Sequence, residues 1–171
     1  MSDGRILVVF FSRSGTTRKL ASAIAASLGA DLEEICDYSD RRGVGGYIRS
    51  LIDAVGRRSV EIVPGGHDVA AYDLVVVGTP VWAGMPSAPV RAWLTANKGH
   101  LRHLAVFCSL GGRGSDTAFA EMSTLAGRAP LARCKVTARD LRHGEVRTLI
   151  SRFTDGLRRK VATFGEVEWM C

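Results

Sequence analysis

The sequence predicts a doubly wound α/β fold in three layers, with a five-stranded parallel sheet in the order 2-1-3-4-5 between two layers of helices. Short apolar, β-branched runs alternate along the chain with segments that have the spacing of amphipathic helices. Some of the short runs, such as LVVV, are apolar throughout, which is typical of central strands covered on both faces. Strands that are joined by helices indicate parallel pairing.

Five short runs are the predicted strands, because β-branched and apolar residues suit a buried, pleated surface. In chain order they are Ile6–Phe11, Leu32–Ile35, Leu74–Val77, Leu104–Cys108 and Ala132–Thr137. The predicted helices have apolar residues three or four positions apart. They are marked by Leu20, Ile24 and Leu28, by Tyr47–Val55, by Phe119 to Ala126 and by Val146 to Leu157. No linker interrupts this pattern, so residues 1–171 are expected to form a single domain.

The chain is basic, with a formal net charge of +6, but its arginines are spread along the sequence. Nucleic-acid-binding proteins usually gather such charge on one face, so we expect no nucleic-acid partner. The charge would instead attract an acidic protein or an anionic substrate. No apolar run approaches the roughly 20 residues that cross a bilayer. The first residues, MSDGR, are not typical of a secretory signal, so we expect a cytoplasmic protein without membrane insertion.

Cysteine and histidine offer no obvious chemistry. The four cysteines are scattered without metal-site spacing, and we expect reduced thiols at Cys36, Cys108, Cys134 and Cys171, two of them in strands. The histidines fall in expected loops or helix ends, without the neighbouring group that would orient a catalytic imidazole. The sequence therefore predicts neither metal ligands nor catalytic side chains.

The loop SRSGTT, residues 12–17, follows the first predicted strand and leads directly into a helix. Its hydroxyl groups can donate hydrogen bonds, and Gly15 lets the backbone approach a ligand closely. The first helical turn adds free N–H groups and the positive end of the helix dipole, which together favour a phosphate. An ordinary capped turn is the alternative. The loop matches neither the Walker A pattern nor the dinucleotide fingerprint.

Two further loops follow the third and fourth strands, and both should lie at the same sheet edge as the first. The loop GTPVWAGMPSAPVRAWL carries Trp82, which could stack on a flat ring or pack in the core, and flexible Gly84. The loop CSLGGRGSD has three glycines in four positions and exposes bare backbone. The three loops predict one pocket with a phosphate grip, a partner for a flat ring and room for a ring edge.

Two other phosphate-handling classes are disfavoured. A phosphoacceptor receiver needs carboxylates at the end of the first strand, where Phe10, Phe11 and Ser12 stand. A cysteine-dependent phosphatase needs an arginine six positions after its cysteine, and the candidate Cys108 has Gly114 there.

The three loops, in this order, resemble the flavin loops of the flavodoxin family. VVFFSRSGTTRKLA is similar to the phosphate loop, whose pattern is Ser/Thr-x-Ser/Thr-Gly-x-Thr. DLVVVGTPVWAGMPSAPVRAWL resembles the loop that flanks the isoalloxazine ring, and VFCSLGGRGSD resembles the second flavin loop. The resemblance extends from Arg5 to about Gly127, and RRGVGGYIRSLIDAVGRRSVEI resembles an insert of short flavodoxin-like proteins.

This resemblance implies noncovalent binding of FMN and assigns a part of the cofactor to each loop. It gives the phosphate to Ser12, Arg13, Ser14, Gly15, Thr16 and Thr17. It gives the ring to Pro80, Val81, Trp82, Ala83 and Gly84, with the peptide near Gly84 facing flavin N5. It gives the pyrimidine edge and the ribityl chain to Ser109, Leu110, Gly111, Gly112 and Arg113.

The chain departs from classical flavodoxins in two ways. The second flavin loop lacks the tyrosine that often covers the outer ring face, and the chain is basic where classical flavodoxins are strongly acidic. A cation near the pyrimidine edge favours the anionic reduced flavin, so we expect Arg113 to raise the flavin potential if its side chain points there.

The resemblance implies electron transfer and leaves the use of the electrons open. A flavodoxin-like carrier would exchange electrons with a redox partner protein, whereas a small reductase would take hydride from NAD(P)H and reduce a quinone or similar acceptor. The missing tyrosine and the basic surface favour the reductase; the lack of a recognisable nicotinamide site favours the carrier. A regulatory or assembly module without catalysis is a further alternative. The C-terminal EVEWMC is a candidate anchor for a homodimer through Trp169.

Overall fold

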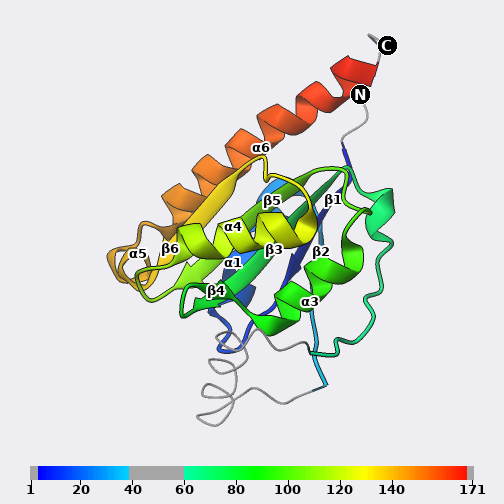
Figure 1. Ribbon diagram of the computed structural model, residues 1–171. Helices are drawn as coiled ribbons and strands as arrows, with labels where there is room; N and C mark the ends of the chain where they lie inside the picture. The colour runs from blue at the N-terminus through cyan, green and yellow to red at the C-terminus, as the bar shows by residue number, and fades with distance from the viewer. Residues whose placement is uncertain (1–3, 39–59, 169–171) are drawn as a thin grey trace.

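A parallel sheet in the order β2-β1-β3-β5-β6 forms the middle layer of the computed structural model, which describes residues 4–38 and 60–168 (Figure 1). The strands are β1 (Ile6–Phe10), β2 (Asp31–Glu34), β3 (Leu74–Trp82), β4 (Met85–Pro86), β5 (Leu104–Leu110) and β6 (Arg133–Thr137). The helices are α1 (Thr16–Leu28), the short 3-10 helix η1 (Val69–Ala71), α3 (Ala88–Asn97), α4 (Ser115–Ala126), α5 (Ala138–His143) and α6 (Val146–Glu168). Because β4 only pairs antiparallel with β3, the five-stranded order 2-1-3-4-5 is confirmed.

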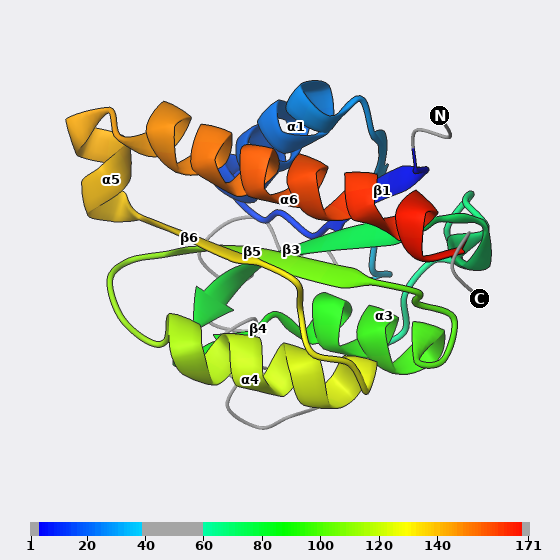
Figure 2. The ribbon, with the colours of Figure 1, turned by 90° about the horizontal axis from the view of Figure 1, so that it is seen from above.

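Helices cover both faces of the sheet, with α1 and α6 on one side and α3 and α4 on the other (Figure 2). Along each strand, successive side chains enter opposite layers. In β3, for example, Leu74 and Val76 pack with α1 and α6, while Val75 and Val77 pack with α3 and α4. The three-layer prediction is therefore confirmed. In the described part of the chain, no helix has the length and apolar character needed to cross a membrane.

The centre of the sheet depends on one glycine. Gly78 of β3 lies beside Phe107 of β5 in the parallel register, and both belong to strands that are buried on both faces. A Cβ atom at Gly78 would lie 2.0 Å from Cζ of Phe107, so the ring occupies the space of the missing side chain. This close approach lets β3 run unbroken through the core to the loop that carries Trp82.

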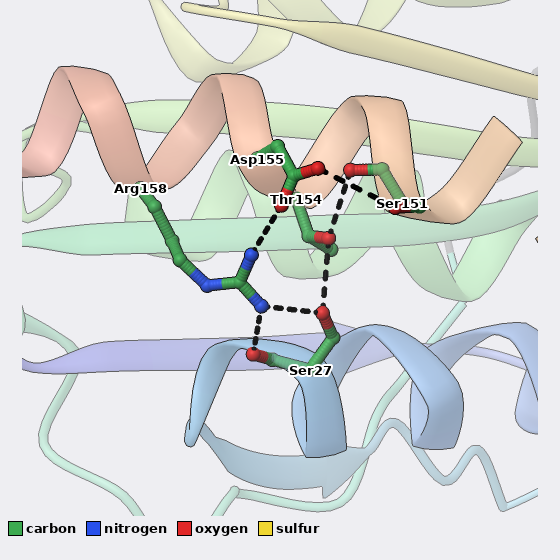
Figure 3. Close-up of polar contacts among 5 residues, drawn as sticks. All are labelled: Ser27, Ser151, Thr154, Asp155 and Arg158. Carbon is green, nitrogen blue, oxygen red and sulfur yellow. Dashed lines mark hydrogen bonds and ion pairs between the residues drawn. The ribbon is translucent and has the colours of Figure 1, made fainter. Parts of the chain in front are cut away.

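A polar network holds the end of α1 against α6 (Figure 3). The guanidinium of Arg158 donates to the carbonyl oxygen of Ser27 and, at 2.7 Å, to its Oγ. Oγ of Ser27 donates to Oγ1 of the buried Thr154 (3.0 Å). Arg158 thereby places a cation at the carbonyl end of α1, where the helix dipole favours positive charge. The network fixes the helix that begins at the predicted phosphate loop.

Each of the five predicted strands differs from the structure at one or both ends: β1 ends at Phe10, β5 extends to Leu110 and β6 begins at Arg133. β3 continues to Trp82 and does not end at Val77. The stretch after Val77 looks like a loop in the sequence, since it contains Pro80 and proline is unusual inside sheets. β2 begins at Asp31 rather than Leu32 and ends at Glu34, since pairing with β1 and not its own polar pattern sets its position. The predicted helix at Tyr47–Val55 lies outside the described residues, and so does Trp169; the first three residues of the C-terminal EVEWMC belong to α6.

Cys108 and Cys134 lie in neighbouring strands, as expected, but they face opposite cores. Burial raises the pKa of the Cys108 thiol to about 12 and that of Cys134 to about 11. In the unfolded chain these thiols would ionise near pH 9. The folded protein resists that ionisation, so its stability relative to the unfolded chain is retained below this pH and falls as pH rises towards 11–12.

We expect this alkaline loss of stability to be smaller in a Cys108→Ala/Cys134→Ala variant. Urea unfolding of both proteins at about pH 8 and about pH 10.5 measures the difference. Equal losses of unfolding free energy in the two proteins would show that the buried thiols do not cause it.

Candidate functional site

The carboxyl ends of β1, β3, β5 and β6 surround a cavity of about 440 Å³. This volume lies within the usual range of small-molecule sites, about 300–1,000 Å³. The residues that line it are Arg13, Ser14, Thr16, Thr17, Pro80, Val81, Trp82, Ala83, Ser109, Leu110, Gly111, Gly112, Arg113, Ala138 and Leu141. Three loops that are far apart in the sequence, together with α5, therefore converge at one edge of the sheet, as the strand pattern predicts.

The first loop presents an open helix N-terminus to the cavity. The residue before α1 is Gly15, whose φ of +97° is a conformation that favours glycine. No side chain caps the first turn of α1, although Ser14 and Thr16 line the cavity beside it. Uncapped N–H groups and the positive end of the helix dipole make this turn suited to an anion.

Two hydroxyl groups of this region are used inside the protein. Oγ of the buried Ser12 accepts the Gly15 N–H at 3.1 Å, which closes the loop on itself. Oγ1 of Thr17 and Oγ of Ser109 share a buried hydrogen bond of 2.8 Å. This second bond ties the first turn of α1 to the end of β5 and fixes the floor of the cavity.

The second loop is a tight hairpin. β3 turns back into β4 through Ala83 and Gly84, with φ of +51° and +74°. Two consecutive positive φ values fit the two-residue turn that matches the strand twist in hairpins. In the described part of the chain, Ala83 alone adopts positive φ without being glycine. Such backbone strain costs about 1–3 kcal/mol and tends to occur at functional sites.

Buried polar contacts hold the base of this hairpin. Thr79 and Ser87 are both fully buried, and the Ser87 N–H donates to Oγ1 of Thr79 at 2.9 Å. Thr79 in turn donates to the carbonyl oxygen of Pro80 (2.8 Å). With its base fixed, the hairpin holds the half-buried Trp82 in position at the cavity.

Trp82 contacts both the core and the cavity. Its ring meets Phe11 edge to face, with centroids 6.5 Å apart at 79°, and the guanidinium of Arg13 lies 5.9 Å from the indole. The side chain also packs against the core beneath α3 and α4. The two interpretations of Trp82, as core residue and as ring partner in a pocket, are therefore compatible.

The third loop packs directly on the second. Gly114 precedes α4 with φ of +97°, and a Cβ atom there would lie 2.6 Å from Cα of Gly84. The two backbones are thus in contact, and glycine at position 114 is required both by conformation and by space. The bare backbone of Gly111 and Gly112 remains on the cavity side.

The fourth part of the site, α5, was not predicted. Thr137 and Asp140 form a reciprocal capping box: the Asp140 N–H donates to Oγ1 of Thr137, and the Thr137 N–H donates to the carboxylate at 2.7 Å. These hydrogen bonds lower the pKa of Asp140. The helix that they start places Ala138 and Leu141 at the cavity. The start of this helix could have been found in the sequence from the Thr-x-x-Asp pattern of a capping box at Thr137 and Asp140.

The structure brings together every predicted site residue except three. Ser12, Gly15 and Gly84 do not line the cavity; they shape the two loops that do. Within the described residues, no group of three or more histidine, cysteine or acidic side chains is placed to hold a metal. The site combines an anion-binding helix turn, an indole and open glycine backbone, which suits binding of a planar molecule with a negatively charged tail.

Comparisons with known proteins give the family and the fold of the chain. The flavodoxin family model matches residues 5–152. No curated protein matches the chain. Among solved structures, a flavoprotein in complex with FMN from Lactobacillus acidophilus has a TM-score of 0.66 at 21% identity, covering 82% of this chain and 97% of that one.

Two more solved structures have the same fold. A putative flavoprotein from Bacteroides eggerthii has a TM-score of 0.69 at 18% identity and covers 88% of this chain and 98% of its own. Oxidised flavodoxin 2 from Bacillus cereus has a TM-score of 0.58 at 19% identity and covers 91% and 99%. The family match spans most of the sequence and includes all three loops: the chain belongs to the flavodoxin family.

Proposed function

We propose that the protein binds FMN noncovalently in the cavity at the carboxyl edge of the sheet and serves in electron transfer. The observation that carries the proposal is the convergence of an uncapped α1 turn, Trp82 and the Gly111–Gly112 backbone on one cavity. Membership of the flavodoxin family and the fold shared with an FMN complex support it.

The residues fit the parts of FMN. The first turn of α1, with the hydroxyls of Ser14 and Thr16, would hold the phosphate. The hairpin with Trp82 would flank the ring, and the bare glycine backbone would receive its edge. Bound FMN supplies the redox chemistry; the chain supplies binding, orientation and local charge. Arg113, exposed at the cavity, is the cation whose charge would favour the reduced anion.

A reductase is a second candidate, because Trp82 is the one aromatic side chain that lines the cavity in the described part of the chain. The lining that α5 contributes is Ala138 and Leu141, and Leu141 is 45% exposed. An uncovered ring face would admit hydride from NAD(P)H and a small acceptor such as a quinone. Anaerobic mixing of the FMN-loaded protein with NADPH separates the two uses. Rapid bleaching of the flavin absorbance supports a reductase, and a stable spectrum supports a carrier that receives electrons from a protein partner.

A Gly114→Ala variant tests the contact between the second and third loops. We expect weaker FMN binding and a stability loss of about 2–4 kcal/mol, because the new Cβ combines positive-φ strain with a clash. Gly99→Ala is the matched control, since Gly99 has a φ of +92° but no atom within 4 Å of the added carbon. FMN titration and urea unfolding of both variants measure the effect. If Gly99→Ala weakens FMN binding equally, the loop contact is not responsible.

A further inference from the structure

The surface beside the cavity carries positive charges without partners. We call it the α5 face and define it by Arg113, Arg139, Leu141 and Arg142. Ala138 and Leu141 line the cavity and lie three residues apart on α5. Arg139 and Arg142 have the same spacing and lie one residue further on, about 100° around the helix. They therefore flank the cavity without lining it. Figure 2 shows α5 at the end of β6, with α6 leading away from it.

Three exposed arginines near the cavity make no ion pair or side-chain hydrogen bond with the described part of the chain: Arg113, Arg139 and Arg142. The stretch 133–147 holds five lysines and arginines against two acids, one of which, Asp140, is engaged by Thr137. Exposed, unpaired charges of one sign near a redox site attract a partner of the opposite sign over several ångströms.

The opposite edge of the sheet is built differently. The acids of β2 are bonded within the protein: Asp31 accepts from the Tyr72 hydroxyl, Glu33 accepts from the His67 N–H (3.1 Å), and Glu34 accepts from the Arg18 Nε (3.2 Å). β2 is four strands from β6 in the sheet, about 19 Å at the usual strand spacing, which exceeds the screening length of about 8 Å at physiological ionic strength, so these carboxylates do not cancel the charge of the α5 face. The basic residues around α5 outnumber the acids in the stretch 133–147, where Glu145 is the exposed acid, and Asp116 is the acid nearest to Arg113 in sequence, so the surface next to the cavity is positive on balance.

Leu141 gives this face an apolar contact point. It is one of four large apolar side chains that are exposed in the described residues, and it alone among them lines the cavity. Protein interfaces commonly have an apolar centre and a charged rim. The charges of the rim steer the approaching partner and fix its orientation.

We propose that the α5 face is the docking surface for an acidic electron-transfer protein. The inference rests on the proposed function only in its redox step, because docking itself depends on the side chains of this chain. In that step one electron leaves the reduced flavin for the partner's oxidised centre. Two one-electron acceptors are thus reduced for each two-electron reduced FMN, and the flavin protons are released to solvent.

Two forms of one acceptor test the charge preference. Native cytochrome c is basic, and succinylated cytochrome c has its lysine amines converted to carboxylates while keeping the same haem. The FMN-loaded protein is reduced with dithionite, freed of excess reductant and mixed anaerobically with each form. We expect the succinylated form to be reduced at least about tenfold faster at low ionic strength, with the preference disappearing at about 0.5 M salt.

Binding is measured separately from electron transfer. Calorimetric titration of the protein with ferric succinylated cytochrome c, at low salt and without reductant, gives the affinity of the docking step alone. The same titration on the flavin-free protein should give a similar affinity. If FMN binding fails while this affinity remains, the proposed cofactor is wrong and the docking surface stands.

Charge variants locate the surface. Arg139→Glu/Arg142→Glu should reduce both the affinity and the rate for succinylated cytochrome c at least about tenfold, and Arg139→Gln/Arg142→Gln should have an intermediate effect. The rate with neutral benzoquinone should not change. Arg159→Glu is the matched control: Arg159 is exposed on α6, thirteen residues and about 20 Å along the helix from its start.

Three results would overturn the proposal. One is equal affinity of the wild type for both cytochromes; another is an equal loss in the Arg159→Glu control. The third is a double variant that loses its reaction with NADPH while keeping its affinity for the acidic protein, which would assign the arginines to a nucleotide instead.

Discussion

Replacing Gly78 with alanine should lower the free energy of unfolding by about 3 kcal/mol, at the upper end of the usual cost of overpacking. The added Cβ would lie 2.0 Å from Cζ of Phe107, in a strand pair with no exposed side to relax into. Protein interiors are packed densely enough that neither strand can shift freely. Equilibrium urea unfolding, followed by circular dichroism, measures the loss.

Two further variants isolate the clash. Gly66→Ala is the control, because no atom lies within 4 Å of a Cβ there and φ is not positive. In Gly78→Ala/Phe107→Leu the smaller side chain makes room, so part of the stability should return. An unchanged unfolding midpoint in Gly78→Ala would contradict the close approach of Phe107 on which the path of β3 depends.

The second large effect is expected at the end of the cavity that we propose holds the phosphate. Ser14→Ala/Thr16→Val removes two hydroxyls beside the uncapped turn of α1. Two hydrogen bonds to a charged group contribute about 3 kcal/mol together, so FMN affinity should fall about 100-fold. Riboflavin lacks the phosphate, and its affinity should not change. Fluorescence titration of the flavin-free protein with each flavin measures both affinities.

A matched control removes a hydroxyl elsewhere. Thr124 is exposed on α4 and bonds only within its own helix, to the Ala120 carbonyl oxygen. Thr124→Val should leave both affinities unchanged. If Ser14→Ala/Thr16→Val weakens riboflavin as much as FMN, these hydroxyls do not contact the phosphate.

The sequence predicted the strands that are covered on both faces and the helices that bury one face against the sheet. The predicted runs of the central strands are apolar because helices cover both faces of the sheet there, and α6 repeats its apolar residues because one face meets the sheet. The pocket followed from the same pattern, since parallel strands bring their carboxyl ends to one edge.

The remaining features depend on contacts that no local pattern records. The extent of β3 was hidden by Pro80, and α5 is too short for periodicity to reveal, so Leu141 was missed. In the predicted phosphate loop, spacing does not distinguish Ser12, whose hydroxyl accepts the Gly15 N–H, from Ser14, which lines the cavity. That distinction depends on how the loop folds back on itself.

The central claim is that the cavity beside Trp82 takes FMN by its ring and its phosphate together. Calorimetric titration of the flavin-free protein with FMN and with riboflavin tests it most directly. The account predicts one FMN per chain, accompanied by a shift of the flavin absorption bands, and an affinity for riboflavin weaker by at least about 100-fold. Failure to bind FMN, or equal affinities for the two flavins, would contradict it.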